Sequence, residues 1–284
     1  DYYDTSLKNA RINKLKSYPN FFFKKIDIVD KKSLKKCFYS FNPKNVINLA
    51  SQPGVRYSSL NPNIYINSNI VGFLNIIELS KQFNVEGFFY ASSSAIYGQN
   101  DKIPFELKNK LSKPISLYGI TKLTNELIAY SYSQLYGIRT TGLRYFTVYG
   151  PWYRPDMALF IFIDRIISNQ PIKVFNNGNM KRDFTYIDDI IDGTRSAIKH
   201  NYKCEIFNLG SSNSENLLDV IHIIENELGK KAIIDFLPKY PEDNLETCAN
   251  IKYSEKKINF YPKTNVKKGI PMLIKWYKEY YNVS

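Results

Sequence analysis

Hydrophobic and polar residues alternate in two ways along the first half of the chain. Short runs rich in apolar and β-branched residues predict strands at 20–28, 45–50, 87–91 and 139–146. Between them, apolar residues recur with the spacing of one helix face, which predicts helices at 6–16, 31–41, 62–83 and 116–136. This alternation predicts an α/β fold with a doubly wound parallel sheet, covered by helices on both faces.

After Gly150 the pattern changes to a mixed one. It predicts strands at 172–175, 205–209 and 232–236, and helices at 157–168, 188–199, 216–228 and 266–281. We therefore expect two domains: 1–150, an incomplete Rossmann-like domain that binds NAD, and 151–284, a smaller mixed α/β substrate domain. Residues 183–210 are expected partly to rejoin the first domain through the strand at 205–209.

Composition excludes several classes of protein. The chain has 284 residues and 44% hydrophobic residues, enough for a substantial core. Its longest apolar run, 158–163, is far too short to span a bilayer, so we predict no membrane association. Three scattered cysteines fit reduced thiols in a cytoplasm. With only two histidines, we predict neither a metal site nor a Ser-His-Asp site.

The formal net charge of +13 raises the question of a nucleic-acid partner. The excess consists of 31 lysines and 8 arginines, and the lysines are spread along the chain rather than gathered in a stripe. We therefore predict a solvated lysine surface and no nucleic-acid binding. Attraction of an anionic nucleotide substrate stays open.

A dinucleotide-binding fold normally opens with a strand, a glycine-rich turn and a helix that together hold the pyrophosphate. Among the 13 glycines the closest pair, Gly137 and Gly142, is five residues apart, so this fingerprint is absent. Such an opening takes about 30 residues. We expect the chain to be an N-terminally truncated piece of a longer protein, with a gap in the sheet between the strands at 20–28 and 45–50. The alternative is a complete protein with a different cofactor loop.

Tyr118 and Lys122 lie four residues apart on a predicted helix and share a face. A nearby ammonium favours phenolate, so we expect Lys122 to lower the pKa of Tyr118 from about 10 toward neutrality. Such a tyrosine can accept a hydroxyl proton while hydride leaves the same carbon. Pairs at this spacing also arise by chance in a chain so rich in Tyr and Lys. We expect the second pair, Tyr253 and Lys257, to be a surface pair without function.

Ser94 follows the strand predicted at 87–91, where parallel sheets bind their ligands. Its hydroxyl could bind the substrate hydroxyl and share the proton with Tyr118. A plain polar turn after a strand is the alternative, but the downstream Tyr118 and Lys122 favour a catalytic site.

Several segments resemble the extended short-chain dehydrogenase/reductase family: 48–50 (NLA), 90–98 (YASSSAIYG), 118–122 and 143–146 (LRYF). Segments 52–57 (QPGVRY), 147–158 (TVYGPWYRPDMA) and 182–189 (RDFTYIDD) are similar to its UDP-glucuronate 4-epimerase subgroup. The resemblance implies an NAD-dependent isomerase, consistent with the cytoplasmic location expected from the cysteines. It leaves open whether helices 62–83 and 116–136 form the bundle of a homodimer. The isomerase would invert C4 of a UDP-hexuronic acid, UDP-glucuronate to UDP-galacturonate, through a transient 4-keto sugar.

The resemblance also implies roles for residues, with Tyr118 as catalytic base and acid, Lys122 as its electrostatic partner and Ser94 on the reacting hydroxyl. Besides Tyr118 and Lys122, the implied cofactor-binding residues are Asp27, Ile28, Ala50, Ser51, Gln52, Asn69, Ser92, Tyr145 and Phe146. The implied substrate-binding residues are Ser93, Ser94, Arg56, Thr147, Arg154, Met157, Phe175 and Arg182.

A hexuronate carboxylate needs a cation, and a guanidinium can bind it through two parallel hydrogen bonds. Arg154 and Arg56 are the candidates. For Arg56 a solvent-facing loop position is an equal alternative, and for Phe175 a core position competes equally with stacking on uracil. Departures from the subgroup are Tyr153 and Glu242, each of which stands where glycine is usual.

Two alternatives remain. One is another nucleotide-sugar enzyme of the family, a UDP-glucose 4-epimerase or a 4,6-dehydratase, although a dehydratase would need an acid where Ser94 stands. The other is an inactive, truncated nucleotide-sugar-binding fragment.

Without the glycine fingerprint, we expect the 284-residue chain to produce no UDP-galacturonate from UDP-glucuronate and NAD⁺. A version extended by the upstream segment of its reading frame should produce it, because the pyrophosphate site would be restored. Product analysis by chromatography distinguishes the two. Inactivity of the extended, folded protein would contradict the epimerase assignment.

Overall fold

Four apolar strands form the central parallel sheet of the computed structural model, which describes residues 2–99, 102–108 and 114–283. Their order is β1-β2-β3-β8. Their bounds are β1, Asn45–Asn48; β2, Gly87–Ser93; β3, Thr140–Tyr145; and β8, Cys204–Leu209. β2 and β3 are buried almost throughout, as expected of strands with helices on both faces. The predicted doubly wound α/β fold is confirmed.

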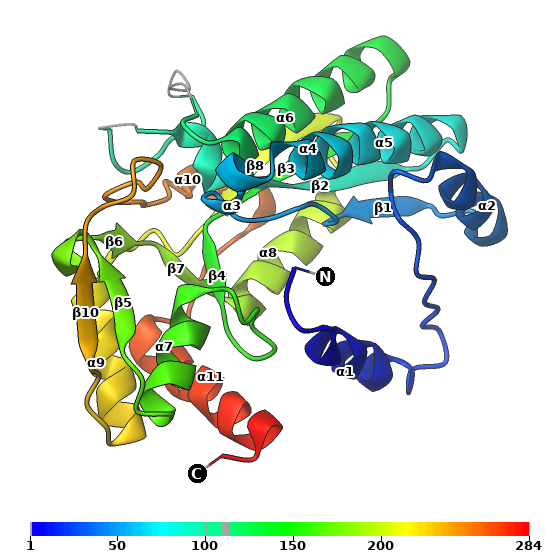
Figure 1. Cartoon of the computed structure of the whole chain (residues 1–284). Helices are drawn as coiled ribbons and strands as arrows, with labels where there is room; N and C mark the ends of the chain where they lie inside the picture. Colours follow the sequence, from blue (N-terminus) through cyan, green and yellow to red (C-terminus); the bar gives the residue numbers. More distant parts are fainter. Residues whose placement is uncertain (1, 100–101, 109–113, 284) are drawn as a thin grey trace.

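Helices cover both faces of this sheet (Figure 1). The core of one face joins α2 (Lys31–Phe41), α5 (Gly72–Gln82) and α6 (Leu117–Tyr136) to β2 through buried side chains such as Phe73 and Phe88. On the other face, Phe207 and neighbouring side chains pack against α8 (Ile187–His200) and α10 (Lys252–Ile258). Two separate apolar cores therefore sandwich the sheet.

The helix predicted at 62–83 is one continuous rod with a change of winding. It consists of α4 (Pro62–Tyr65), a π-helical turn η1 (Ile66–Val71) and α5. Buried Asn69 lies in the π turn, a feature that is frequent at functional sites. The short helix α3 (Tyr57–Leu60) precedes it.

The start of α6 lies close to the end of β2. Ser116 caps the helix, and its hydroxyl accepts a hydrogen bond from the Gly119 N–H at 3.0 Å. A Cβ on Gly119 would lie 2.7 Å from the carbonyl oxygen of Ala95, a backbone atom of the 3₁₀ turn η2 (Ser94–Tyr97). Glycine thus permits the close approach that brings Tyr118 to the serines.

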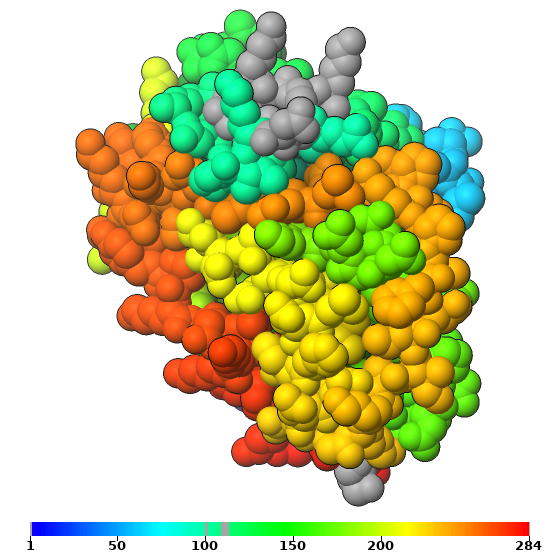
Figure 2. Space-filling view, turned by 90° about the vertical axis from the view of Figure 1, so that its left-hand side faces the viewer, coloured from blue at the N-terminus to red at the C-terminus, as the bar shows by residue number. Residues whose placement is uncertain are grey.

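The C-terminal region has its own core, to which α1 (Thr5–Leu15) contributes Leu7. In Figure 2 the orange segment that follows α9 lies beside green residues of the β5 region, because β10 pairs with β5 in parallel. The helices are α7 (Ala158–Ile167), α9 (Leu217–Leu228) and α11 (Val266–Tyr281). The paired strands are β5 (Ile172–Phe175) with β10 (Ile234–Leu237), β4 (Thr147–Tyr149) with β7 (Phe184–Tyr186), and β6 (Lys181–Arg182) with β9 (Glu215–Asn216). A 3₁₀ turn, η3 (Asn176–Gly178), follows β5.

One predicted element is wrong: residues 20–28 form no strand. A strand persists only with a hydrogen-bonded neighbour, and within the described part of the chain β1 pairs with β2 alone. Phe22 and Phe23 are consequently 69% and 51% exposed, and Ile47 of β1 is 46% exposed.

Asp183 fastens the C-terminal region to the end of β8. This fully buried carboxylate accepts hydrogen bonds from the Ser211 N–H (2.6 Å) and hydroxyl (2.8 Å), the Ser212 N–H, the Ala249 N–H and the Thr185 hydroxyl. Five donors compensate for the burial of the charge, so this single side chain joins three segments: 183–185, 211–212 and the segment around Ala249.

A buried ion pair fixes α6 on the sheet. Arg144 of β3 donates from Nε (2.9 Å) and Nη2 (2.8 Å) to the carboxylate of Glu126 on α6, and both side chains are 4% exposed. The Ser92 hydroxyl also donates to Glu126, and Arg144 Nη1 donates to the Tyr97 hydroxyl. Since Glu126 lies one turn beyond Lys122, the pair sets the position of Lys122 and Tyr118.

We predict that Glu126→Gln lowers the free energy of unfolding by about 3–5 kcal/mol, because it leaves a buried guanidinium without its counter-charge. Urea denaturation measures the change. Glu279→Gln is the matched control, since its pair with Lys275 is long (3.9 Å) and exposed and should cost under about 1 kcal/mol. Equal losses in the two variants would contradict the role of the buried pair.

Candidate active site

A cavity of about 1120 Å³ lies between the carboxyl ends of the sheet strands and the C-terminal region. Ligands of parallel sheets bind at this edge. Its wall includes all the predicted substrate-binding residues: Arg56, Ser93, Ser94, Thr147, Arg154, Met157, Phe175 and Arg182. It also includes six residues predicted to contact the cofactor: Ser51, Ser92, Tyr118, Lys122, Tyr145 and Phe146.

Five other predicted cofactor residues lie outside the wall: Asp27, Ile28, Ala50, Gln52 and Asn69. Asp27 is exposed and accepts from the Val29 N–H, while Ile28 packs toward Gly72. Asn69 is buried and fully used. Its amide oxygen accepts from the Gln52 N–H (2.7 Å), and its amide nitrogen donates to the Gln52 carbonyl and the Thr121 hydroxyl.

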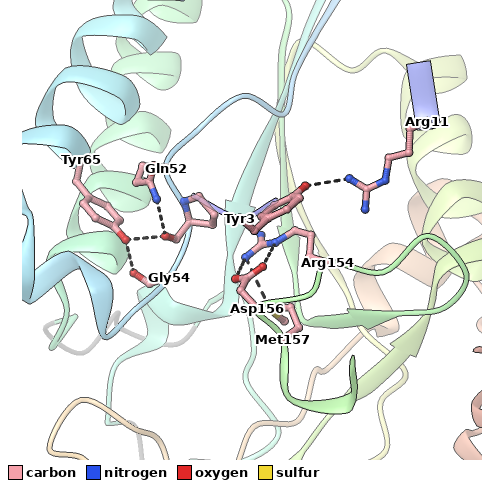
Figure 3. A network of polar contacts seen from close by, with 9 residues as sticks. Tyr3, Arg11, Gln52, Gly54, Tyr65, Arg154, Asp156 and Met157 are labelled. Carbon is pink, nitrogen blue, oxygen red and sulfur yellow. Dashed lines mark hydrogen bonds and ion pairs between the residues drawn. The ribbon is translucent and has the colours of Figure 1, made fainter. Parts of the chain in front are cut away.

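The loop that follows β1 is therefore attached to the helical rod formed by α4, η1 and α5. Besides the bonds of Asn69, the Tyr65 hydroxyl lies 2.6 Å from the carbonyl oxygen of Pro53 and 2.7 Å from that of Gly54, the contact visible at the left of Figure 3. These bonds hold the backbone of the loop at the rim of the cavity.

Tyr118 and Lys122 both line the cavity, and Lys122 Nζ lies 5.8 Å from the centre of the Tyr118 ring. Lys122 donates to the Ala91 carbonyl at 2.9 Å, and burial lowers its pKa to about 8. Burial raises the pKa of Tyr118, and a hydrogen bond with Ser93 and the charge of Arg154 lower it only in part. The expectation that Lys122 makes this phenol acidic is thus wrong, because desolvation outweighs every nearby charge.

The second pair at the same spacing is a useful comparison. Lys257 Nζ lies 5.7 Å from the centre of the Tyr253 ring on α10. Tyr253 is 37% exposed, and its hydroxyl donates to Glu205. Pair geometry is therefore the same at both places, and only burial beside a cavity distinguishes Tyr118.

β2 continues two residues beyond its predicted end, so that Ser92 and Ser93 lie in the strand and Ser94 follows it. Because side chains of a strand alternate in direction, the three serines have different surroundings. Ser92 is buried and donates to Glu126, so its hydroxyl is used inside the protein. Ser93 accepts from the Ala95 N–H at 3.2 Å, and its side chain lowers the pKa of Tyr118 in part. Ser94 begins η2 and lines the cavity. Ser93 and Ser94 therefore both lie on the cavity wall beside Tyr118, and the role predicted for Ser94 stays a prediction.

Arg154 has a carboxylate partner that the sequence analysis missed. Its Nε donates to Asp156 Oδ1 at 2.9 Å and its Nη2 to Asp156 Oδ2 at 2.5 Å (Figure 3). Burial disfavours the charged guanidinium, but Asp156 outweighs this effect and the pKa of Arg154 lies above its ordinary value. The motif 154–157 (RPDM) held the signal, an acid two residues after the arginine.

The loop that carries Arg154 is anchored by Trp152. This residue has a φ of 64°, unusual for a bulky side chain. Its ring packs on those of Trp276 and Tyr280, at 5.7 and 5.4 Å between centroids, and its carbonyl accepts from Arg11. Packing on α11 and a hydrogen bond from α1 together hold the strained backbone.

Arg56 is also paired, across the cavity. It donates to both carboxylate oxygens of Asp243, at 3.3 and 2.6 Å. Its guanidinium lies 4.0 Å from the centre of the Phe175 ring and 4.2 Å from that of Tyr240. Arg56 thus links the loop after β1 to the C-terminal region, and Phe175 belongs to the cavity wall rather than to the closed core.

Arg182 lies near this pair. Burial lowers its pKa, the charge of Asp243 opposes that effect, and its Nη1 donates to the Lys181 carbonyl at 2.8 Å. Two guanidinium groups therefore stand on the wall around one carboxylate, Asp243, a residue that sequence reasoning missed.

Residues 2–99, 102–108 and 114–283 contain no cluster of three or more His, Cys, Asp or Glu side chains that could hold a metal ion. Nor do they contain a helix that is both long and apolar enough to cross a membrane.

Comparison with known proteins places this site in a family. Residues 3–210 match the NAD dependent epimerase/dehydratase family. The chain belongs to this family. It is 43% identical to the protein CapI of Staphylococcus aureus, covering 99% of this chain and 89% of CapI. It is also 43% identical to a UDP-glucuronate 4-epimerase of Thermodesulfobacterium geofontis, covering 98% and 86%.

A solved structure agrees over nearly the whole chain. It is UDP-glucuronic acid 4-epimerase from Bacillus cereus in complex with UDP-glucuronic acid and NAD. The TM-score is 0.91 at 32% identity, over 98% of this chain and 88% of the other.

The lowered pKa of Lys122 gives a pH dependence. Between about pH 8 and 10.5 the unfolded chain holds a proton at this site that the folded protein has lost. Unfolding free energy should therefore rise with pH in that window, and stay flat below it. We predict that wild type gains stability relative to Lys122→Met there, by at most about 1.4 kcal/mol per pH unit. Urea titrations at several pH values test this, and a pH-independent difference would contradict it.

Proposed function

We propose that the protein epimerises a UDP-hexuronic acid at C4, converting UDP-glucuronate to UDP-galacturonate. The observation that carries the proposal is the placement of Tyr118 on the wall of a cavity that Ser93, Ser94 and Arg154 also line. The similarity to enzymes with the name UDP-glucuronate 4-epimerase supports it. The protein is thus an isomerase under this proposal.

The family is NAD dependent, and the residues present suit the nicotinamide end of that cofactor. Lys122 has three N–H donors, yet within the described residues its ammonium bonds only to the Ala91 carbonyl. Donors therefore remain for the hydroxyl groups of a ribose, and Tyr118, Tyr145 and Phe146 line the adjoining wall. When bound, NAD would supply the acceptor and donor of hydride at C4.

In this mechanism the Tyr118 phenolate takes the proton of the C4 hydroxyl as the 4-keto sugar forms. It later returns a proton to the C4 oxygen, after the sugar has turned its opposite face to the hydride donor. Ser93 donates to the phenolate oxygen, and Ser94 binds the reacting hydroxyl. Since burial raises the pKa of Tyr118, its deprotonation depends on the groups that lower that pKa, Ser93 and Arg154. Arg182 and Arg56 would hold the diphosphate, and Phe175 the uracil ring.

A second candidate function is the 4-epimerisation of a UDP-hexose that has no carboxylate, the reaction of a UDP-glucose 4-epimerase. One observation favours it: both arginines proposed for the sugar carboxylate already have acidic partners, Asp156 and Asp243. The chain is also similar, at 26% identity and a TM-score of 0.87, to a UDP-glucose 4-epimerase from Thermotoga maritima. Comparing UDP-glucuronate with UDP-glucose as substrates separates the two. The cytoplasmic location and the homodimer stay predictions.

We predict that Tyr118→Phe lowers kcat by about 10²–10⁴-fold, because the phenylalanine ring can neither accept nor return the proton. The assay uses protein from the full reading frame with NAD⁺ and UDP-glucuronate, and follows UDP-galacturonate.

Tyr253→Phe is the matched control, since this tyrosine has a lysine at the same spacing on a different helix. It should leave kcat unchanged. Near-normal turnover by Tyr118→Phe would show that Tyr118 is not the base, and a folded wild type that converts neither substrate would refute the function itself.

A further inference from the structure

The guanidinium of Arg154 is held by one edge only. Asp156 accepts from Nε and Nη2, and within the described residues no hydrogen bond leaves Nη1. A guanidinium has five N–H donors in a planar fork. One acidic partner on the Nε side therefore leaves the Nη1 end for a second anion.

The residues around Arg154 favour this one orientation of its guanidinium. Asp156 and Arg154 both line the cavity, with side chains 19% and 33% exposed, so the pair is half withdrawn from solvent. Met157 Sδ lies 3.8 Å from Nη2, and the charge of Arg154 acts on Tyr118. Trp152 anchors the same loop, because its ring packs on that of Trp276.

We propose that Asp156 is the positioning residue of Arg154. It fixes the guanidinium by its Nε–Nη2 edge and thereby presents the Nη1 end to a carboxylate on the sugar. It is thus the residue that sets preference for a hexuronate over a neutral hexose. This inference rests on the proposed function, and it deepens it by naming a specificity determinant.

The opposite role would also follow from an ion pair. If Asp156 simply occupied the place of the sugar carboxylate, it would compete with the hexuronate. The two roles predict opposite effects for Asp156→Asn, which keeps the shape of the side chain but loses its charge. Preference for the hexuronate falls if Asp156 positions Arg154, and rises if it competes.

Calorimetric titration of UDP-glucuronate and UDP-glucose measures this preference as the ratio of their two Kd values. The protein comes from the full reading frame and is saturated with NAD⁺. We expect Asp156→Asn and Arg154→Lys each to lower the preference by about tenfold, the effect of one lost charge-assisted contact. The double variant should fall no further, because the two residues act as a unit.

Two further variants complete the design. Asp156→Glu keeps the charge and should restore part of the preference. Asp235→Asn removes a negative charge elsewhere on the cavity wall and should change both affinities equally, leaving the ratio unaltered. Thermal unfolding checks that each variant is folded.

An unchanged or increased ratio in Asp156→Asn overturns the inference, as does the same loss in Asp235→Asn. If Arg154→Lys leaves the ratio unchanged, the assignment of Arg154 to the sugar carboxylate fails instead. If Asp156→Asn does not fold, Asp156→Glu decides. A ratio below the wild-type value supports the inference, because the longer side chain misplaces the guanidinium, and a ratio at or above the wild-type value overturns it.

Discussion

The buried pair of Arg144 and Glu126 is the contact on which the site depends. Tyr118 and Lys122 lie on α6, whereas the serines that meet them lie at the end of β2. A helix can slide or rotate on a sheet of apolar side chains at little cost, because the hydrophobic effect has no direction. Two parallel hydrogen bonds from β3, with a third from Ser92, remove that freedom. The close approach at Gly119 then completes the alignment.

Much of the fold could be predicted from the sequence, since its large elements have strong periodic patterns. The helices at 31–41 and 266–281 have the predicted bounds. Elements of two or three residues, such as β6 and β9, carry no periodic signal and were missed. The failure at 20–28 has another cause. Its composition suits a strand, but strand formation depends on a neighbour, which local sequence does not encode.

The substrate-binding residues predicted from the sequence all line the cavity, but the electrostatics of the site could not be predicted. Motifs found the residues of the wall because they mark where a chain turns at the edge of a sheet. They could not reveal that Arg56 meets Asp243, 187 residues away, or that Arg154 meets Asp156. Nor could spacing reveal that burial raises the pKa of Tyr118, because desolvation depends on the whole surroundings of the phenol. In each case the missing information lies in tertiary contacts.

The single-sided pairing of β1 has a consequence for handling the protein. Along its other edge the backbone N–H and C=O groups lack a strand partner within the described residues, and Ile47 of the same strand is exposed. Such an edge is a template for intermolecular β-pairing. Aggregation of concentrated solutions would then begin from the folded state, so charged substitutions at this edge would improve solubility without touching the cavity.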